Sequence, residues 1–180
     1  MSLFTDKTVY SCPKENLNQK EKLCYDALEK LQISYQRVSH ESVGTIEGCK
    51  EVEEVLGVEI VKNLFLCNAQ KTDFYLVLMP GEKPFKTKFL SPQLNCSRLS
   101  FAPPEFMEEL IGCTPGSASV LGLLKDKDFK VRLVIDKDLL NREYFGCHPM
   151  DNTSSLKIKT QDIIDKFLPY CDHTPTYVEL

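Results

Sequence analysis

The sequence lacks any apolar run that approaches the roughly 18 residues a membrane-spanning helix needs. Its first residues carry neither the basic stretch nor the apolar core of a signal peptide. It also lacks an excess of positive charge, since 22 Lys and Arg face 26 Asp and Glu for a net charge of −4. These absences predict a cytoplasmic protein and exclude a general nucleic-acid coat. They still allow a small site that holds one end of a nucleic acid.

Several catalytic motifs are absent as well. The chain has no Walker motif, no G-x-G-x-x-G, no G-x-S-x-G and no H-E-x-x-H. No C-x-x-C pair occurs among the eight scattered cysteines, so neither a zinc site nor a disulfide framework is expected. Cys113 and Cys147 lie in loops and stay open as nucleophiles, although neither has a neighbouring cation in the sequence that would favour the thiolate.

What the sequence does contain is a pattern of alternating helices and strands. It predicts helices at 18–31, 45–56, 104–111 and 160–168, a short helix from Ser91, and a helical turn at 137–141. It predicts strands at 34–38, 60–67, 74–79, 98–101, 129–135, 143–147 and 155–159. The resulting expectation is one α/β domain with a mixed sheet of about seven strands flanked by helices.

The chain divides by pattern into three parts. Residues 1–17 show no clear period and are expected to form an N-terminal extension, and residues 18–168 form the domain. Residues 169–180 are expected to be a loose polar tail, with His173 facing solvent.

Two loops stand out chemically. Residues 112–119 read Gly-Cys-Thr-Pro-Gly-Ser-Ala-Ser, which suits a tight turn that exposes backbone N–H groups to an anion or a polarised carbonyl. Residues 145–155 combine similar polar groups with His148. For both segments, a purely structural role as a turn is a strong alternative. His148 is equally consistent with a structural histidine. Together they favour a polar pocket built from loops, and His40 is a further candidate for its wall.

Lys62 and Asn63 interrupt an otherwise apolar strand. A lysine there is unfavourable unless it is paired, borders a pocket or reaches solvent from a strand end. The pair could therefore hold a phosphate or a carboxylate, and the solvent-facing alternative stays open.

Five segments carry a resemblance to a known family. They are Lys62-Asn63-Leu64-Phe65-Leu66, Tyr75-Leu76-Val77-Leu78, Arg98-Leu99-Ser100-Phe101-Ala102, Gly112-Cys113-Thr114-Pro115-Gly116-Ser117, and His148-Pro149 followed by Asn152-Thr153-Ser154-Ser155. In order and spacing they resemble the YbaK/prolyl-tRNA-synthetase-associated domain, especially its PrdX/ProXp-ala branch of alanyl-tRNA(Pro) deacylases. The resemblance covers residues 20–168 and implies the mostly antiparallel editing-domain fold.

The resemblance also implies an activity and roles for residues. The activity is hydrolysis of the ester that joins a wrong amino acid, alanine above all, to the end of proline tRNA, with no metal and no cofactor. Lys62 would hold the terminal phosphate or ribose, the turn around Gly116 would stabilise the oxyanion, and His148 would shape the site or orient water. Further substrate contacts would come from Asn63, Thr45, Thr114, Ser117, Asn152, Thr153 and Ser154. Candidates for tRNA contacts are Lys83, Lys86, Lys88 and Arg98.

One segment departs from the family pattern. Residues 41–45 read Glu-Ser-Val-Gly-Thr where relatives often have proline and phenylalanine-threonine, so the size limit of the pocket could differ. The sequence also leaves two other functions open. One is a non-catalytic module that binds aminoacyl-tRNA or a synthetase, with prolyl-tRNA synthetase as the expected partner. The other is a small-molecule hydrolase that uses Cys113 or Cys147.

Overall fold

The computed structural model describes residues 5–42 and 46–180. Eight strands in the described residues form two sheets, not one. The smaller sheet has the order β1-β7-β6 and is antiparallel throughout: β1 Tyr35–Ser39, β6 Tyr144–Cys147 and β7 Ser154–Lys159. The larger sheet has the order β4-β2-β3-β5-β8: β2 Lys62–Cys67, β3 Phe74–Met79, β4 Ser100–Phe101, β5 Val131–Asp136 and β8 Thr176–Val178. The mixed α/β prediction is confirmed, because β3, β5 and β8 run parallel while β2 runs antiparallel to β3 and β4.

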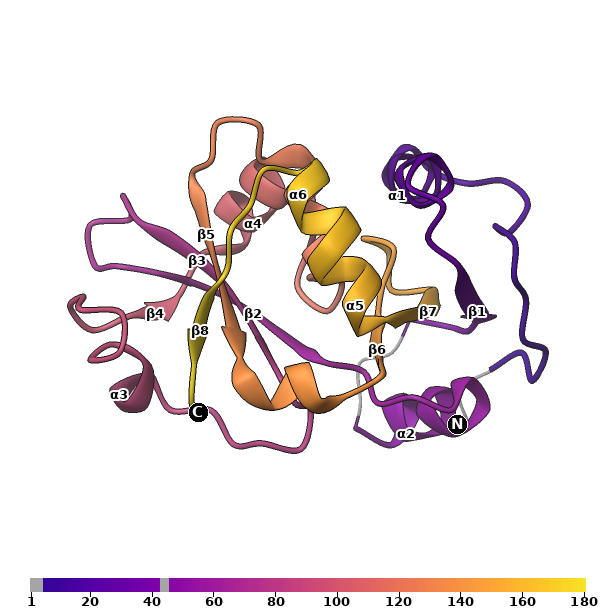
Figure 1. The fold of residues 1–180 in the computed structure, drawn as a ribbon, viewed down its shortest axis with the longest axis horizontal. Helices are drawn as coiled ribbons and strands as arrows, with labels where there is room; N and C mark the ends of the chain where they lie inside the picture. Colours follow the sequence, from indigo (N-terminus) through magenta and orange to yellow (C-terminus); the bar gives the residue numbers. More distant parts are fainter. Residues whose placement is uncertain (1–4, 43–45) are drawn as a thin grey trace.

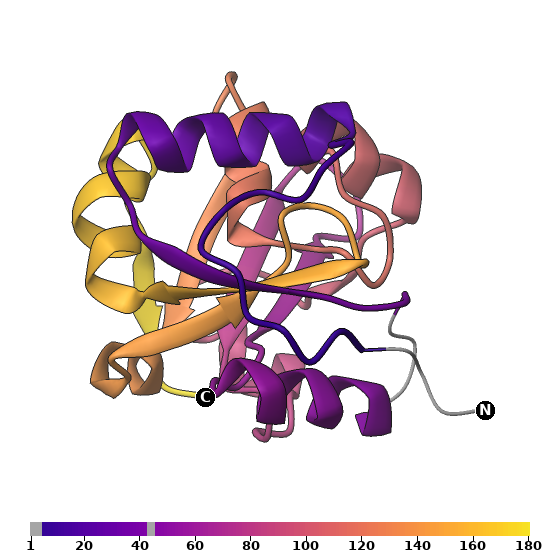
Figure 2. The same cartoon turned by 90° about the vertical axis from the view of Figure 1, so that its right-hand side faces the viewer.

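Helices enclose the smaller sheet. Helix α1 (Gln19–Lys30) lies over one face of it, and α2 (Ile46–Leu56) lies over the other (Figure 2). The start of α1 follows from its sequence: Asn18 and Glu21 form a reciprocal capping box at its first turn. The helix predicted at 18–31 is thereby confirmed.

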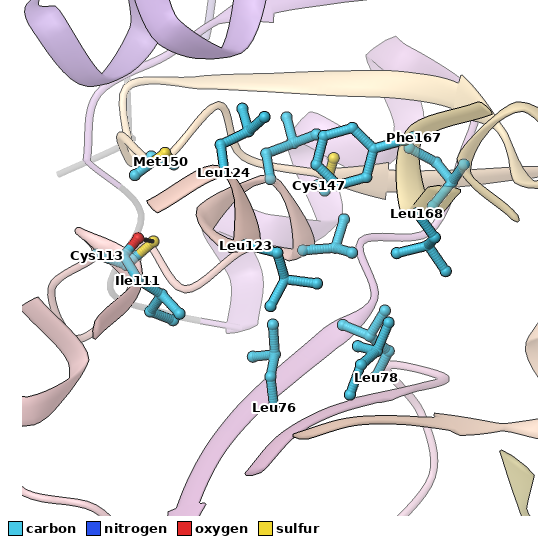
Figure 3. Packing of buried hydrophobic residues seen from close by; sticks show 14 of the residues in the cluster. Leu76, Leu78, Ile111, Cys113, Leu123, Leu124, Cys147, Met150, Phe167 and Leu168 are labelled. Atoms are coloured by element: carbon cyan, nitrogen blue, oxygen red, sulfur yellow. Dashed lines mark hydrogen bonds between the residues drawn. The ribbon is translucent and has the colours of Figure 1, made fainter. Parts of the chain in front are cut away.

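The larger sheet is covered on both faces, as its continuous apolar strands predict. One face packs with α1, α4 (Pro104–Ile111) and the C-terminal helical run, and this cluster extends to the smaller sheet (Figures 1 and 3). The other face packs with α3 (Thr87–Leu90) and the chain end. The apolar run after the glycine-rich loop forms a buried 3₁₀ helix, η1 (Val120–Lys125), and the turn predicted at 137–141 is the 3₁₀ helix η2 (Lys137–Asn141).

The two sheets meet where β6 passes the start of β2. Gly146 forms a parallel bridge with Ile60, its N–H donates to the Glu59 carbonyl at 3.0 Å, and its carbonyl accepts the Val61 N–H at 3.0 Å. A Cβ at Gly146 would lie 2.9 Å from the backbone oxygen of Glu59 and 3.2 Å from Ile60 Cα. Only glycine therefore permits this close approach of the two chains.

Three local predictions need correction. The short helix lies at Thr87–Leu90 and ends at Ser91 instead of beginning there, because Leu90 is the residue that the core buries. Thr160 does not cap the last helix with its side chain. That helical run, α5 (Thr160–Asp162), η3 (Ile163–Phe167) and α6 (Leu168–Tyr170), continues past Pro169, which stands in the first turn of α6, where a residue without an N–H is tolerated.

The expectation of a loose C-terminal tail is wrong. Residues 176–178 form β8 on the edge of the larger sheet, paired with β5. His173 is buried, and its Nε2 lies 3.0 Å from Asp126 Oδ2. The tail is therefore anchored at both the sheet and the loop before β5.

The N-terminal extension lies along the free edge of β1. Tyr10 and Arg37 exchange backbone hydrogen bonds of 2.8 and 2.7 Å, and the Arg37 guanidinium lies 4.6 Å from the centre of the Tyr10 ring. The Asp6 N–H also donates to the Ser39 carbonyl at 2.9 Å. The extension thus covers part of an edge strand that would otherwise be open to pairing.

Candidate active site

The glycine-rich loop forms a closed turn after α4. Gly112 ends the helix in the left-handed conformation. The Thr114 N–H donates to Ser117 Oγ at 3.0 Å, and the Ser117 N–H donates to the Thr114 carbonyl at 2.9 Å. Gly116 has φ +90° at the exposed tip, and its N–H has no partner among the described residues. The turn therefore engages its own serine, while the Gly116 amide stays open at the tip.

This turn packs against the loop that carries His148. A Cβ at Gly112 would lie 2.7 Å from Met150 Cε, and one at Gly116 would lie 3.2 Å from Asn152 Nδ2. Cys113 and Met150 enter the same buried cluster behind the turn (Figure 3). The structure thus brings together the two loops that the sequence singles out.

Asp151 organises the second loop. Its Oδ1 accepts the Thr153 N–H at 3.0 Å and the Thr153 hydroxyl at 2.5 Å, while its Oδ2 accepts Asn18 Nδ2 at 3.0 Å. Burial opposes ionisation here, but the hydrogen bonds from Thr153 and the charge of Lys14 lower the pKa of Asp151 overall. Lys14 also donates to Thr153 Oγ1 at 3.3 Å, so the N-terminal extension contacts this loop.

His148 is held by backbone and side chain together. Its Nδ1 lies 2.9 Å from the Ser154 carbonyl and 3.2 Å from Ser155 Oγ. Burial, the largest influence, lowers the pKa of His148, so its imidazole is neutral near pH 7. Ser154 itself is fully buried, and its hydroxyl has no hydrogen-bond partner in the described residues.

Lys62 begins β2 next to the bridge that joins β2 to the strand before His148. Ile60 and Gly146 form the parallel bridge, and Lys62 and His148 each lie two residues beyond it in the same direction. The Lys62 ammonium is half-buried and donates to the Lys83 carbonyl. The side chain is therefore held at a strand end, with a backbone carbonyl as its described partner.

Asn63 points the other way. Neighbouring residues of a strand alternate between faces, so Asn63 lies opposite Leu78 on the face away from Lys62, which pairs with Met79. Its Nδ2 donates to the Val61 carbonyl at 3.1 Å, and its Oδ1 is buried without a partner in the described residues. Lys62 and Asn63 do not approach one group from the same face. Thr45, the remaining predicted contact, lies outside the described residues.

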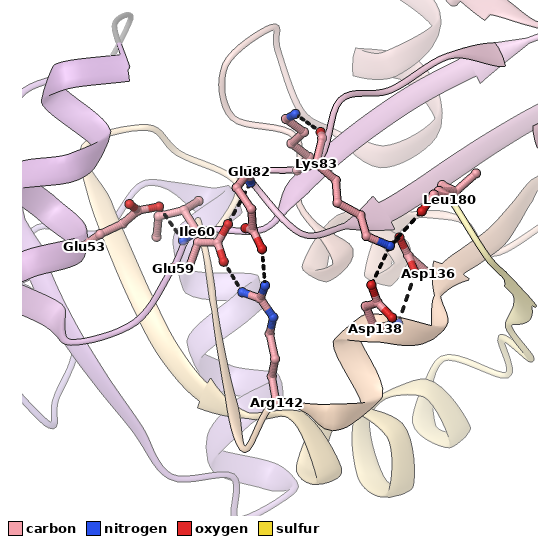
Figure 4. A network of polar contacts seen from close by, with 10 residues as sticks. Glu53, Glu59, Ile60, Glu82, Lys83, Asp136, Asp138, Arg142 and Leu180 are labelled. Atoms are coloured by element: carbon pink, nitrogen blue, oxygen red, sulfur yellow. Dashed lines mark hydrogen bonds and ion pairs between the residues drawn. The ribbon is translucent and has the colours of Figure 1, made fainter. Parts of the chain in front are cut away.

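The candidate tRNA contacts fall into two kinds. Lys83 is half-buried and already paired, with Asp136 at 2.7 Å, with Asp138 at 2.6 Å and with the Leu180 carbonyl at 2.7 Å (Figure 4). The exposed candidates are Lys86, Lys88 and Arg98. Of the four candidates, these three are the fully exposed ones.

A separate groove of about 980 Å³ opens beside α1 and the start of β1. Tyr25 and Tyr35 line it together with Lys157 and Lys159, and none of the predicted site residues does. Its size alone therefore does not make it the reaction site.

The family of this chain follows from its similarity to known proteins. The model of the aminoacyl-tRNA editing domain matches residues 40–166. The chain belongs to the aminoacyl-tRNA editing domain family. Both candidate loops and Lys62 lie inside the matched region.

Individual relatives of this editing domain support the same family assignment. The chain is 32% identical over 136 residues to the prolyl-tRNA editing protein ProX of Acetoanaerobium sticklandii, covering 76% of this chain and 83% of the relative. It is 30% identical over 166 residues to prolyl-tRNA synthetase associated domain-containing protein 1 of Xenopus laevis, covering 89% and 95%. A crystal structure described as a candidate trans-editing enzyme for prolyl tRNA synthetase has a TM-score of 0.67 at 18% identity, over 92% of this chain and 99% of that one. The predicted family, the editing-domain fold and the enzyme class, an aminoacyl-tRNA deacylase, are confirmed.

The cysteines of this editing domain are poorly suited to catalysis. Cys113 and Cys147 are fully buried, and burial raises the pKa of each thiol to about 12. A thiolate nucleophile would be scarce at neutral pH, which weighs against the cysteine-hydrolase alternative. All eight cysteines are free.

Three neighbours of His148 carry little signal in the sequence: Asp151, Ser155 and His40. An aspartate two residues before a threonine, as in Asp151-Asn152-Thr153, is a signature of a side chain that caps its own turn and could have indicated Asp151. Ser155 lies in a polar run whose pattern predicts only the start of a strand.

None of the helices in residues 5–42 and 46–180 has both the length and the apolar character that a membrane span requires.

Proposed function

We propose that this editing domain hydrolyses the ester between a wrong amino acid, preferentially alanine, and the 3′ end of proline tRNA. The observation that carries the proposal is the contact between the Gly116 turn and the His148 loop. Together they offer an unpaired backbone N–H and a neutral imidazole, the two groups that ester hydrolysis uses to stabilise an oxyanion and to accept a proton.

The proline tRNA part of the proposal rests on the relatives. One is named a prolyl-tRNA editing protein, and others are named for association with prolyl-tRNA synthetase. A synthetase pocket that fits proline discriminates only weakly against a smaller side chain, so alanyl-tRNA(Pro) is an error that needs a second site. Prolyl-tRNA synthetase is accordingly the partner we propose.

No covalent intermediate is required. The Ser117 hydroxyl donates to the Thr114 carbonyl at 3.0 Å and accepts the Thr114 N–H, so it is committed to the turn. With the nearby thiols protonated, water assisted by His148 or by the 2′-hydroxyl of the substrate is the nucleophile.

A deacylation panel tests the function. Alanyl-, cysteinyl-, seryl- and threonyl-tRNA(Pro) are incubated with the protein, with alanyl-tRNA(Ala) as the tRNA control. We expect the half-life of alanyl-tRNA(Pro) to shorten most. Unchanged half-lives across the panel would exclude the function, and binding of charged tRNA without turnover would favour the non-catalytic module.

Lys62→Ala tests the role of the lysine. We expect a folded protein with a raised KM, because the ammonium is proposed to hold the substrate phosphate or ribose. Lys22→Ala, which removes an exposed ammonium on α1, is the matched control. A Lys62→Ala protein with wild-type kcat/KM would remove Lys62 from the site.

A further inference from the structure

Three side chains from separate segments form a continuous hydrogen-bond chain beside the candidate site. His40 follows β1, His148 follows β6 and Ser155 lies in β7. His40 Nε2 lies 2.8 Å from Ser155 Oγ, and Ser155 Oγ lies 3.2 Å from His148 Nδ1. His40 and Ser155 are buried, so water does not compete strongly for these bonds.

The carbonyl groups at both ends determine where the protons are. A carbonyl oxygen only accepts, so His40 Nδ1, 2.7 Å from the Glu41 carbonyl, must carry a proton. By the same argument His148 Nδ1, 2.9 Å from the Ser154 carbonyl, carries one too. In the neutral form, each ring therefore has its lone pair on Nε2.

Ser155 fits between these two rings in only one way. Its hydroxyl donates to the lone pair on His40 Nε2 and accepts a share of the His148 Nδ1–H. The order of donation is thus His148 to Ser155 to His40 to the Glu41 carbonyl. Within this hydrogen-bond chain of three side chains, every polar atom then has a partner except His148 Nε2, which has none among the described residues.

The surroundings keep both rings neutral. Burial is the largest influence on each, and it lowers the pKa of His40 and of His148. Asp151 and Lys14 are the charged groups that act on His40, and they oppose each other. The two ring centres are 6.0 Å apart, so a charge on either ring would disfavour a charge on the other.

We propose that Ser155 and His40 are positioning residues that hold His148 as the Nδ1–H tautomer and present its Nε2 lone pair to the reacting water. This inference rests on the proposed function and adds two residues to its site. In the reaction, His148 Nε2 takes a proton from water as the water oxygen bonds to the ester carbonyl carbon. The bond from that carbon to the 3′ oxygen then breaks, and the imidazolium returns the proton to the 3′ oxygen.

Nuclear magnetic resonance of protein labelled with ¹⁵N-histidine tests the tautomer without any substrate. Long-range proton–nitrogen correlations distinguish the Nδ1–H from the Nε2–H form of each ring. We expect Nδ1–H at both His148 and His40 in the wild type, and loss of the pure form at His148 in Ser155→Ala. An Nε2–H tautomer at His148 in the wild type would overturn the inference, whatever the activity.

Kinetics supply the second readout. We expect Ser155→Ala to lower kcat by about 10-fold or more with little change in KM, as loss of a supporting hydrogen bond around a functional histidine commonly does. Ser155→Thr keeps the hydroxyl and should restore most of kcat. Ser91→Ala, which removes a buried hydroxyl at the end of α3, is the control. Wild-type kcat in Ser155→Ala would overturn the positioning role.

A pair of His40 variants covers the case in which Ser155→Ala does not fold. His40→Gln keeps an amide oxygen that can accept the Ser155 proton, whereas His40→Phe removes the acceptor. We expect kcat to fall more in His40→Phe, and equal kcat in the two variants would overturn the inference. A wild-type protein inactive on every ester would refute the proposed function alone, since the tautomer measurement would still decide the hydrogen-bond chain.

Discussion

At the scale of single residues, the proposed site would depend on backbone geometry as much as on side chains. Gly116 holds φ +90°, a conformation that residues with a Cβ rarely adopt, and it faces Asn152 at close range. The candidate oxyanion donor is the amide of this same residue. Its conformation and its proposed role are therefore inseparable.

Gly116→Val should lower kcat by about 100-fold, because the side chain strains the turn and displaces the amide from the oxyanion. Gly57→Val is the matched control: Gly57 also has positive φ, +68°, but a Cβ there would meet Lys157 Nζ at an ordinary 3.6 Å. Thermal unfolding should show similar destabilisation of both variants, with deacylation lost only in the first. Near-normal deacylation by Gly116→Val would contradict the assignment.

The two buried histidines should make stability depend on pH. Burial lowers the pKa of both in the folded protein, so the unfolded chain binds protons first as the pH falls. The free energy of unfolding should therefore be unaffected by them above about pH 6.5 and should decrease below it. Urea unfolding between pH 7.5 and 5 should show a steeper slope for the wild type than for the His40→Gln, His148→Gln double variant. Parallel slopes would contradict this prediction.

At the scale of elements, ionic clusters secure the chain around the ends of β3 and β5 (Figure 4). Lys83 joins the segment after β3 to Asp136 at the end of β5 and to the chain terminus at Leu180. Arg142, before β6, pairs with both Glu59 and Glu82 beside the junction of the two sheets. The Arg142 cluster ties the segments before β2 and after β3 to the segment before β6, whereas the Lys83 cluster joins parts of the larger sheet and the chain terminus.

Lys83→Met should destabilise the protein by about 3 kcal/mol, because it leaves the fully buried Asp136 carboxylate without its cation. Lys86→Met, at an exposed position three residues on, should change stability little. Urea unfolding at neutral pH measures both. A loss of tRNA affinity in Lys83→Met without a loss of stability would instead support the predicted tRNA contact.

At the scale of the whole molecule, the C-terminal segment is an integral part of the fold. It supplies β8, the buried Val178, the His173 partner of Asp126 and the carbonyl that binds Lys83. The matched family region ends at residue 166, yet the larger sheet is completed beyond it.

A chain ending at Asp172 should lose roughly 5 kcal/mol, comparable to the whole stability of many domains, because it loses buried apolar surface, the buried His173 partner of Asp126 and the Leu180 carbonyl that binds Lys83. Circular dichroism should show no cooperative melt. His173→Gln in the full chain removes only one of these interactions and should melt cooperatively at a lower temperature. A cooperative melt of the truncated chain near the wild-type temperature would show that the segment is dispensable.

The sequence by itself determined the start of α1 and the buried strands, because capping pairs such as Asn18 with Glu21 and apolar runs such as 74–79 act through local contacts. It also indicated the two polar loops and the family. Only the tertiary structure decided the division into two sheets, which depends on the close approach of Gly146 to Ile60, residues far apart in the sequence. The same holds for the site: Ser155 and His40 join His148 through hydrogen bonds between separate segments, and no local pattern of residues encodes such a meeting.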